Sequence, residues 1–102
     1  MEIKVTEHGS KVCLQLSGVV DEKGAEVLKN KLAGINQQQV RQVELDCAGL
    51  QHFGSSGIGK LLIFYKHFVS NGGELSVVNL TSPIYEMFLE LKLDSLFPVG
   101  KG

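Results

Sequence analysis

Two hydrophobic periodicities alternate along the sequence, and this alternation limits the folds that the chain can adopt. Apolar residues occur at every second position in the segments 3–5 and 12–16, as in strands with one buried face. The turn residues His8-Gly9-Ser10 separate these segments, which predicts a hairpin. Later segments have apolar residues three and four positions apart, and they alternate with short strand-like runs. Helices that alternate with strands indicate a mixed sheet with crossover helices.

The predicted order is β-β-α-β-α-β-α, in an α/β fold (an α+β sandwich) with a mixed sheet of four to five strands. Asp21 is placed to cap the first helix, and Gly34 lies near its end. A strand over 40–47 and a polar loop over 50–54 precede the second helix, at about 56–70. Residues 75–80 predict a strand that is buried on both faces. Ser82 and Pro83 are expected to open the third helix as cap and first residue, and a short strand can follow at the C-terminus.

Composition and charge exclude several functional classes. The 102 residues fit one domain, residues 1–102, and 43% of them are hydrophobic, which is enough to form a core. Ten basic and eleven acidic residues leave a net charge of −1, which argues against binding to nucleic acid. No residue spacing indicates a metal or a cofactor. The oligomeric state is left open.

The two cysteines and the N-terminus indicate the compartment. Cys13 and Cys47 lie in apolar-rich stretches without the spacing of a zinc site, so we expect two free, buried thiols in a reducing environment. Met1 to Lys4 lacks the layout of a signal peptide, and the longest apolar run, Leu61 to Phe64, is far too short to span a bilayer. We therefore expect a cytoplasmic protein that is not inserted in a membrane.

The segment Gly54-Ser55-Ser56-Gly57-Ile58-Gly59-Lys60 carries the possible chemistry. It fits the spacing of a phosphate-binding loop, but Leu61 stands where the hydroxyl that holds magnesium is needed. It misses the G-x-S-x-G pattern of a serine nucleophile by one residue. In a third interpretation, Ser55 or Ser56 caps the second helix at an end that favours anions. A phosphate added to such a serine suits a switch in partner binding better than catalysis.

The second helix also has candidate contact residues. At about 100° per residue, one face of this helix carries an apolar stripe. Its members are Ile58, Leu61, Leu62, Tyr65, Phe68 and Val69. Ile63 and Phe64 fall outside this stripe. They are expected to form an exposed contact patch beside Ser55, unless the third helix or a loop covers them.

The segment from Val43 to Gly59, with Gly18-Val19-Val20-Asp21 before the first helix, resembles the STAS domains of bacterial anti-sigma-factor antagonists. The resemblance covers nearly the whole chain and implies a non-enzymatic regulator in bacterial transcription and signal transduction. It implies that Ser55, or alternatively Ser56, is phosphorylated by an anti-sigma factor that is an ATP-dependent serine kinase. The unphosphorylated chain would bind this kinase, and the phosphorylated chain would release it.

The resemblance and the helix pattern together give a set of partner-binding residues. They are Asp21, Gly54, Ser56, Gly57, Lys60, Ile63 and Phe64. Gly54 replaces the acidic residue that commonly precedes the serine in the family, and Lys60 replaces an aliphatic residue. The alternatives are a STAS subunit of a membrane transport system, such as a lipid-transporting ABC assembly, and a stressosome-type scaffold.

Overall fold

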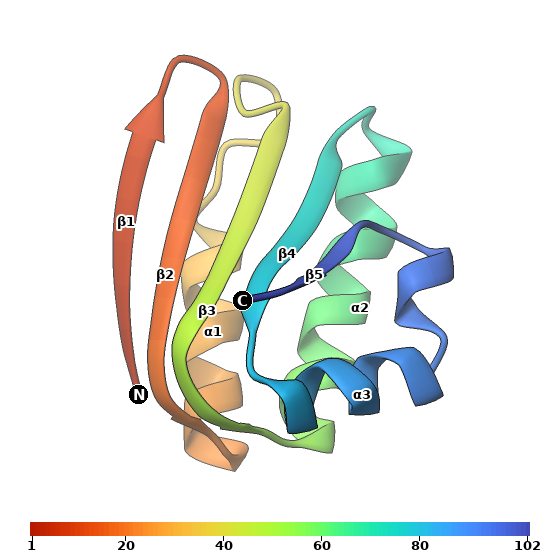
Figure 1. The fold of residues 1–102 in the computed structure, drawn as a ribbon. Coiled ribbons are helices and arrows are strands. Elements are labelled where there is room, and N and C mark those ends of the chain that lie inside the picture. Colours follow the sequence, from red (N-terminus) through yellow and green to blue (C-terminus); the bar gives the residue numbers. More distant parts are fainter.

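The computed structural model describes residues 1–102, in which five strands form one sheet in the order β1-β2-β3-β4-β5. The strands are β1 (Glu2–His8), β2 (Lys11–Val20), β3 (Gln42–Phe53), β4 (Glu74–Leu80) and β5 (Val99–Lys101). The helices are α1 (Glu22–Ala33), α2 (Ser55–Ser70) and α3 (Ser82–Glu90), with a short 3-10 helix at Leu93–Ser95. β1 is antiparallel to β2, and the other pairs are parallel. The predicted fold and element order are confirmed, and β5 is the expected terminal strand (Figure 1).

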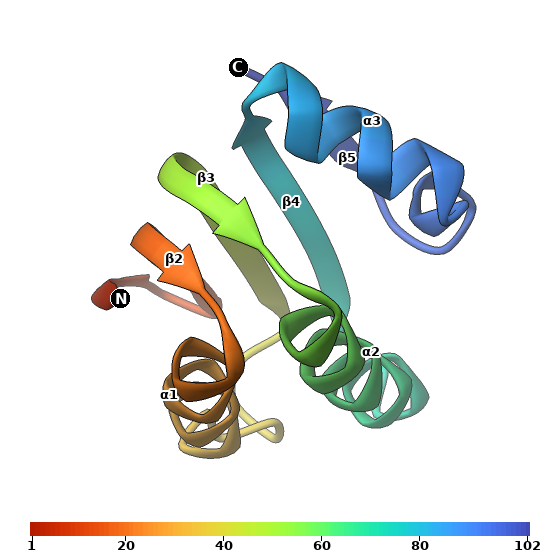
Figure 2. The same ribbon diagram turned by 90° about the horizontal axis from the view of Figure 1, so that it is seen from below.

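α1 and α2 lie side by side on one face of the sheet (Figure 2). The core of 24 buried hydrophobic residues fills the space between this face and the helices. Without a second helical layer, the other face remains polar. In β4, Leu75, Val77 and Leu80 are buried, Ser76 and Val78 are half-buried and Asn79 is exposed. The prediction that β4 is buried on both faces was therefore wrong. None of the helices has the length and hydrophobicity that a membrane-spanning helix needs.

β3 extends six residues beyond the predicted strand over 40–47 and includes most of the segment expected to be a loop. Leu50 pairs with Gly18, and Phe53 pairs with Val20. The β2–β3 register shifts twice in this stretch, between Gln15 and Ser17 and between Gly18 and Val19. As a result, Cys47, Leu50 and Phe53 are buried at intervals of three residues rather than two. Because the buried residues do not alternate strictly, the sequence pattern does not indicate a strand in this stretch.

The helix ends follow the expected chemistry with one correction. The predicted Asp21 cap on α1 is confirmed. α2 ends at Ser70 with Asn71 as its cap, and Gly72 has the positive φ of 84° that the expected left-handed end requires. α3 begins one residue earlier than predicted, because Thr81 occupies the cap position and Ser82 is already helical.

The buried face of α2 is rotated relative to the predicted stripe by about 50° around the helix axis. It consists of Gly57, Ile58, Leu61, Phe64 and Phe68, whereas Val69 is 40% exposed. The displacement arises because α2 packs against α1 as well as the sheet. Phe64 is 7% exposed and stacks on Phe68 with 5.0 Å between ring centroids. The expectation of an exposed Phe64 was wrong, whereas Ile63 is 60% exposed as predicted.

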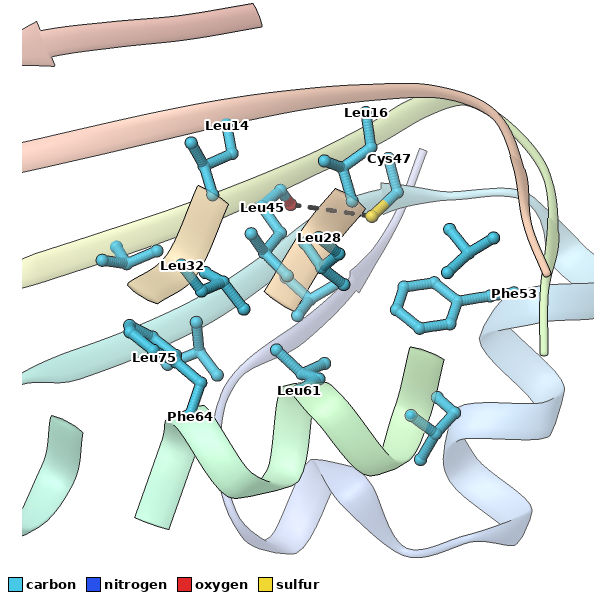
Figure 3. Packing of buried hydrophobic residues seen from close by; sticks show 14 of the residues in the cluster. Leu14, Leu16, Leu28, Leu32, Leu45, Cys47, Phe53, Leu61, Phe64 and Leu75 are labelled. Atoms are coloured by element: carbon cyan, nitrogen blue, oxygen red, sulfur yellow. Dashed lines mark hydrogen bonds between the residues drawn. The ribbon is translucent and has the colours of Figure 1, made fainter. Parts of the chain in front are cut away.

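The interior is uniformly apolar (Figure 3). Phe53 meets Phe88 of α3 edge-on, with 5.4 Å between ring centroids, so α3 closes the core beside the end of β3. Cys47 lies among these side chains, and its Sγ faces the Leu45 carbonyl oxygen at 3.9 Å. Both cysteines are free, but only Cys47 is buried, because Cys13 faces the uncovered side of the sheet and is half-buried.

Phe64 and Ile63 form a matched pair for testing this packing. We expect Phe64→Ala to lower the free energy of unfolding by about 3–5 kcal/mol, the usual effect of deleting a buried ring. Ile63→Ala should change it by less than about 0.5 kcal/mol, because Ile63 is exposed. Urea denaturation followed by circular dichroism measures both values. Similar losses in the two variants would contradict the assignment of Phe64 to the core.

Cys47 is expected to resist thiol reagents in the folded chain. Burial raises the pKa of the Cys47 thiol to about 12, with a smaller contribution from the nearby Asp46 carboxylate. Because the thiolate is the reactive form, alkylation at pH 8 should label Cys13 first and Cys47 only after unfolding. Peptide mass spectrometry of partially labelled protein identifies the order. Labelling of Cys47 at the rate of Cys13 in native protein would show that the core opens readily.

Candidate functional site

The carboxyl ends of β2 and β3 lie at the same end of the sheet because the two strands are parallel. Each strand passes almost directly into a helix, β2 through Asp21 and β3 through Gly54. The backbone N–H of Gly54 donates a hydrogen bond to the Val20 carbonyl at 2.8 Å and holds the two exits together. The N-termini of α1 and α2 therefore lie next to each other (Figure 2).

Asp21 fixes the start of α1. Its Oδ1 accepts a hydrogen bond from the Gly24 backbone N–H at 2.8 Å, and the Asp21 carbonyl accepts one from Ala25. The Gly24 hydrogen bond is the main cause that holds the pKa of the Asp21 carboxyl below its usual range. The side chain is thus committed to capping, although Asp21 itself remains exposed.

α2 begins differently. Gly54 is its cap residue in an extended conformation, and no side chain bonds to the free N–H groups of the first turn. Ser55 and Ser56 are the first two helical residues, and both are exposed. The interpretation in which one of them caps the helix was wrong. Both hydroxyls lie beside the partial positive charge of a helix N-terminus.

Gly57 allows α2 to approach the sheet closely. A Cβ atom at Gly57 would lie 2.4 Å from Val20 Cγ1 and 2.9 Å from Phe53 Cε1, so any side chain would push α2 away from β2 and β3. Gly57 is buried. The prediction that it contacts a partner was therefore wrong, and its role is to set the position of the serines that precede it.

A groove of about 420 Å³ lies between α1 and α2, near the carboxyl ends of β2 and β3. It brings together four of the predicted site residues, Ser55, Ser56, Lys60 and Ile63. The other lining residues are Glu22, Ala25, Glu26 and Gly59. Of the remaining predicted residues, Asp21 and Gly54 cap the two helices outside the lining, and Phe64 belongs to the core.

Charged groups connect the two walls of the groove. Lys60 Nζ on α2 lies 3.7 Å from Glu26 Oε1 on α1. Glu26 Oε2 also lies 3.9 Å from Nζ of Lys29, one turn along the same helix. Glu26 and Lys29 are exposed and Lys60 is half-buried, and ion pairs at the protein surface contribute little to stability. The Glu26–Lys60 pair is therefore easily exchanged for another contact.

The α1 wall is the part of the site that sequence reasoning missed. Glu22, Ala25 and Glu26 are spaced three and four residues apart and so share one side of a helix. This spacing is visible in the sequence, but it does not reveal that this side faces α2. Only the packing of the two helices on the sheet gives these residues a common groove with Ser55.

The structure disfavours a phosphate-binding loop or a catalytic serine in the segment 54–60. A phosphate-binding loop wraps its N–H groups around an anion, whereas residues 55–60 are already helical. No histidine lines the groove, and no three His, Cys, Asp or Glu side chains are grouped as a metal site requires. A larger groove of about 580 Å³ lies beside β4, away from the serines, and there the Tyr65 hydroxyl is engaged in a hydrogen bond to the Leu96 carbonyl.

Comparison with known proteins relates this arrangement to a family. Residues 3–98 match the family model described as "Mlab, STAS domain". The chain is 26% identical over 100 residues to an anti-sigma F factor antagonist of Paenibacillus polymyxa, with 97% of this chain and 83% of that protein covered. It is 34% identical over 90 residues to the putative anti-sigma factor antagonist BtrV of Bordetella bronchiseptica, with 88% and 76% covered.

A solved structure agrees in fold. The Bacillus cell fate determinant SpoIIAA in its phosphorylated form superposes with a TM-score of 0.76 at 19% identity, covering 96% of this chain and 90% of that one. Anti-sigma factor antagonists are regulatory proteins rather than enzymes. With its order of strands and helices and its exposed serines at the start of α2, the chain belongs to the STAS-domain family of anti-sigma factor antagonists.

Proposed function

We propose that this chain controls transcription by binding an anti-sigma factor through the α1–α2 groove, and that phosphorylation of Ser55 ends the binding. The observation that carries the proposal is the free hydroxyl of Ser55 on an exposed groove wall. The partner is a serine kinase that uses ATP, so the chain is its substrate and needs no cofactor of its own. The two curated relatives support the antagonist role, since both are named as anti-sigma factor antagonists.

The groove offers a contact surface for the partner and, at Ser55, a site for the phosphate that ends the binding. Ile63 is 60% exposed and offers an apolar contact, while Glu22, Glu26 and Lys60 surround it with charge. Buried apolar anchors within a charged rim are typical of specific interfaces. Ser55 lines the same groove, five residues before Lys60 and eight before Ile63 on α2, so a phosphate on Ser55 would lie beside the contact area.

A phosphate changes the electrostatics of the groove more than its shape. It adds a charge of about −1.5 to −2 at pH 7 next to a wall that already carries two glutamates. The N–H groups at the start of α2 and the Lys60 ammonium favour that charge within the chain. A partner surface that fits the neutral serine would then have to bury a dianion, which disfavours binding. A solved relative exists in a phosphorylated form, which supports such a modification here.

A second candidate is a STAS subunit of a lipid-transporting ABC assembly. The matched family model, whose description names Mlab, favours keeping this candidate. In that case the same surface would hold a transporter ATPase permanently, with no phosphate cycle. A complex that forms with an ATPase and is unaffected by Ser55→Glu would support this candidate over the antagonist.

Ser55 and Ser56 provide a matched test of the phosphate acceptor. Incubation with the cognate anti-sigma kinase and ATP should label the wild type and Ser56→Ala, because Ser55 keeps its free hydroxyl in both. Ser55→Ala should remain unlabelled. Peptide mass spectrometry locates the phosphate. Labelling of Ser56, or unchanged labelling of Ser55→Ala, would contradict the assignment, and a kinase that binds the chain without labelling it would favour the transporter candidate.

Lys60 is expected to stabilise the phosphate on Ser55. Lys60 lines the same groove as Ser55, and a cation in that groove favours the dianionic form, so Lys60→Met should raise the second pKa of the phosphoserine. Lys29→Met is the matched control, since Lys29 pairs with the same Glu26 but does not line the groove. Phosphorus NMR titration of the phosphorylated variants measures both values. Equal titration of the two variants would show that Lys60 remains with Glu26.

A further inference from the structure

β1 leaves one complete edge of the sheet unpaired (Figure 1). Its seven residues pair with β2 without a break, from Glu2 opposite Ser17 to His8 opposite Lys11. It contains no proline and no bulge, two of the devices that stop an edge strand from pairing with another chain, but it carries the charged residues Glu2, Lys4 and Glu7. The opposite edge differs, because β5 has only three residues and a register shift.

The helical side of the sheet is also uncovered beneath β1. Val5 points to that side, since it pairs with the buried Leu14, yet it is 42% exposed. A groove of about 460 Å³ runs there between β1, β2 and the end of α1. The helix does not reach far enough to cover it. An apolar side chain thus lies at an open strand edge above a partly apolar groove.

We propose that a second copy of this chain occupies this edge, with the two β1 strands antiparallel about a two-fold axis at Val5. The two sheets then form one continuous sheet of ten strands. In this register Val5 faces Val5 of the other copy, Ile3 faces Glu7, Lys4 faces Thr6 and Glu2 faces His8. All seven residues of β1 are paired. The apolar residues Ile3 and Val5 stay on the helical side of the sheet.

The charges of β1 select this register over its neighbours. An axis at Lys4 places two lysines directly opposite each other and pairs only five residues. An axis at Thr6 places Lys4 opposite His8 and leaves Glu2 without a partner. The Val5 axis avoids directly opposed like charges, which destabilise cross-strand pairs, and brings two exposed valines together. This self-complementarity indicates a second copy rather than an unrelated strand.

The helices do not obstruct such a dimer. The two copies of β2 would be three strand spacings apart, about 14 Å. α1 packs beneath β2, and two packed helices need only about 8–10 Å between their axes. The α1–α2 grooves lie on the far side of α1 from β1, so both remain open. The dimer therefore presents two partner sites.

Disulfide trapping tests the register. Cys13 is first replaced by serine, because it lies directly opposite Thr6 in the same chain. In this background Val5→Cys should form a covalent dimer in air, since opposite residues have Cα atoms about 4.5–5.5 Å apart, within disulfide range. Lys4→Cys and Thr6→Cys should each stay monomeric alone, at about 8 Å from their own copies. Mixed together, these two variants should crosslink to each other.

Light scattering on unmodified protein supplies the second measurement. The measured mass should be twice that of the 11.1 kDa chain and should fall to that of one chain in Val5→Lys, which opposes two lysines across the axis. Val69→Lys is the matched control, because Val69 is similarly exposed on α2 and should leave the mass unchanged. A wild-type mass of one chain, or crosslinking of Lys4→Cys alone in preference to Val5→Cys, would overturn the proposal. Neither measurement depends on a kinase or on Ser55.

Discussion

The parallel pairing of β2 with β3 positions both helices that form the candidate site. Parallel strands end at the same edge of a sheet, and here both pass into a helix within two residues. The hydrogen bond from Gly54 N–H to the Val20 carbonyl joins the two exits. Gly57 then lets α2 lie directly against Val20 and Phe53. The side-by-side start of α1 and α2, and with it the groove, follows from these contacts.

Within the site, the backbone is held rigidly, whereas the charged side chains can change partners. The backbone positions of the serines are fixed by the core, through residues such as Phe53 and Leu61 that are almost completely buried. Glu26 and Lys60 of the groove are held only by ion pairs at the surface, which solvent screens. A modification on Ser55 can therefore change the charge contacts of the groove without disturbing the packing beneath it. This division suits a surface whose affinity is switched while the fold persists.

Much of the fold was accessible from local patterns. Alternation in β2, capping by Asp21 and the glycines after α2 each predict an element from neighbouring residues. The errors occurred where the pattern depends on a distant partner. The end of β3 resembles a loop in sequence because register shifts against β2 change the spacing of its buried residues. Phe64 was placed outside because the buried face of α2 is set jointly by α1 and the sheet.

The residues of the candidate site also fall into those that local patterns indicate and those that depend on distant partners. Local sequence patterns indicate that an unusual Gly-Ser segment begins a helix, that the chain is a STAS-like domain, and that Ser55, Lys60 and Ile63 are candidates on that helix. The packing of the helices shows that Glu22 and Glu26 form the facing wall, that Gly57 is a packing residue, and that Phe64 is buried. The physical reason is that propensity, capping and periodicity act over a few residues along the chain. Which helix faces which is decided by strand pairing and close approach between residues more than thirty positions apart.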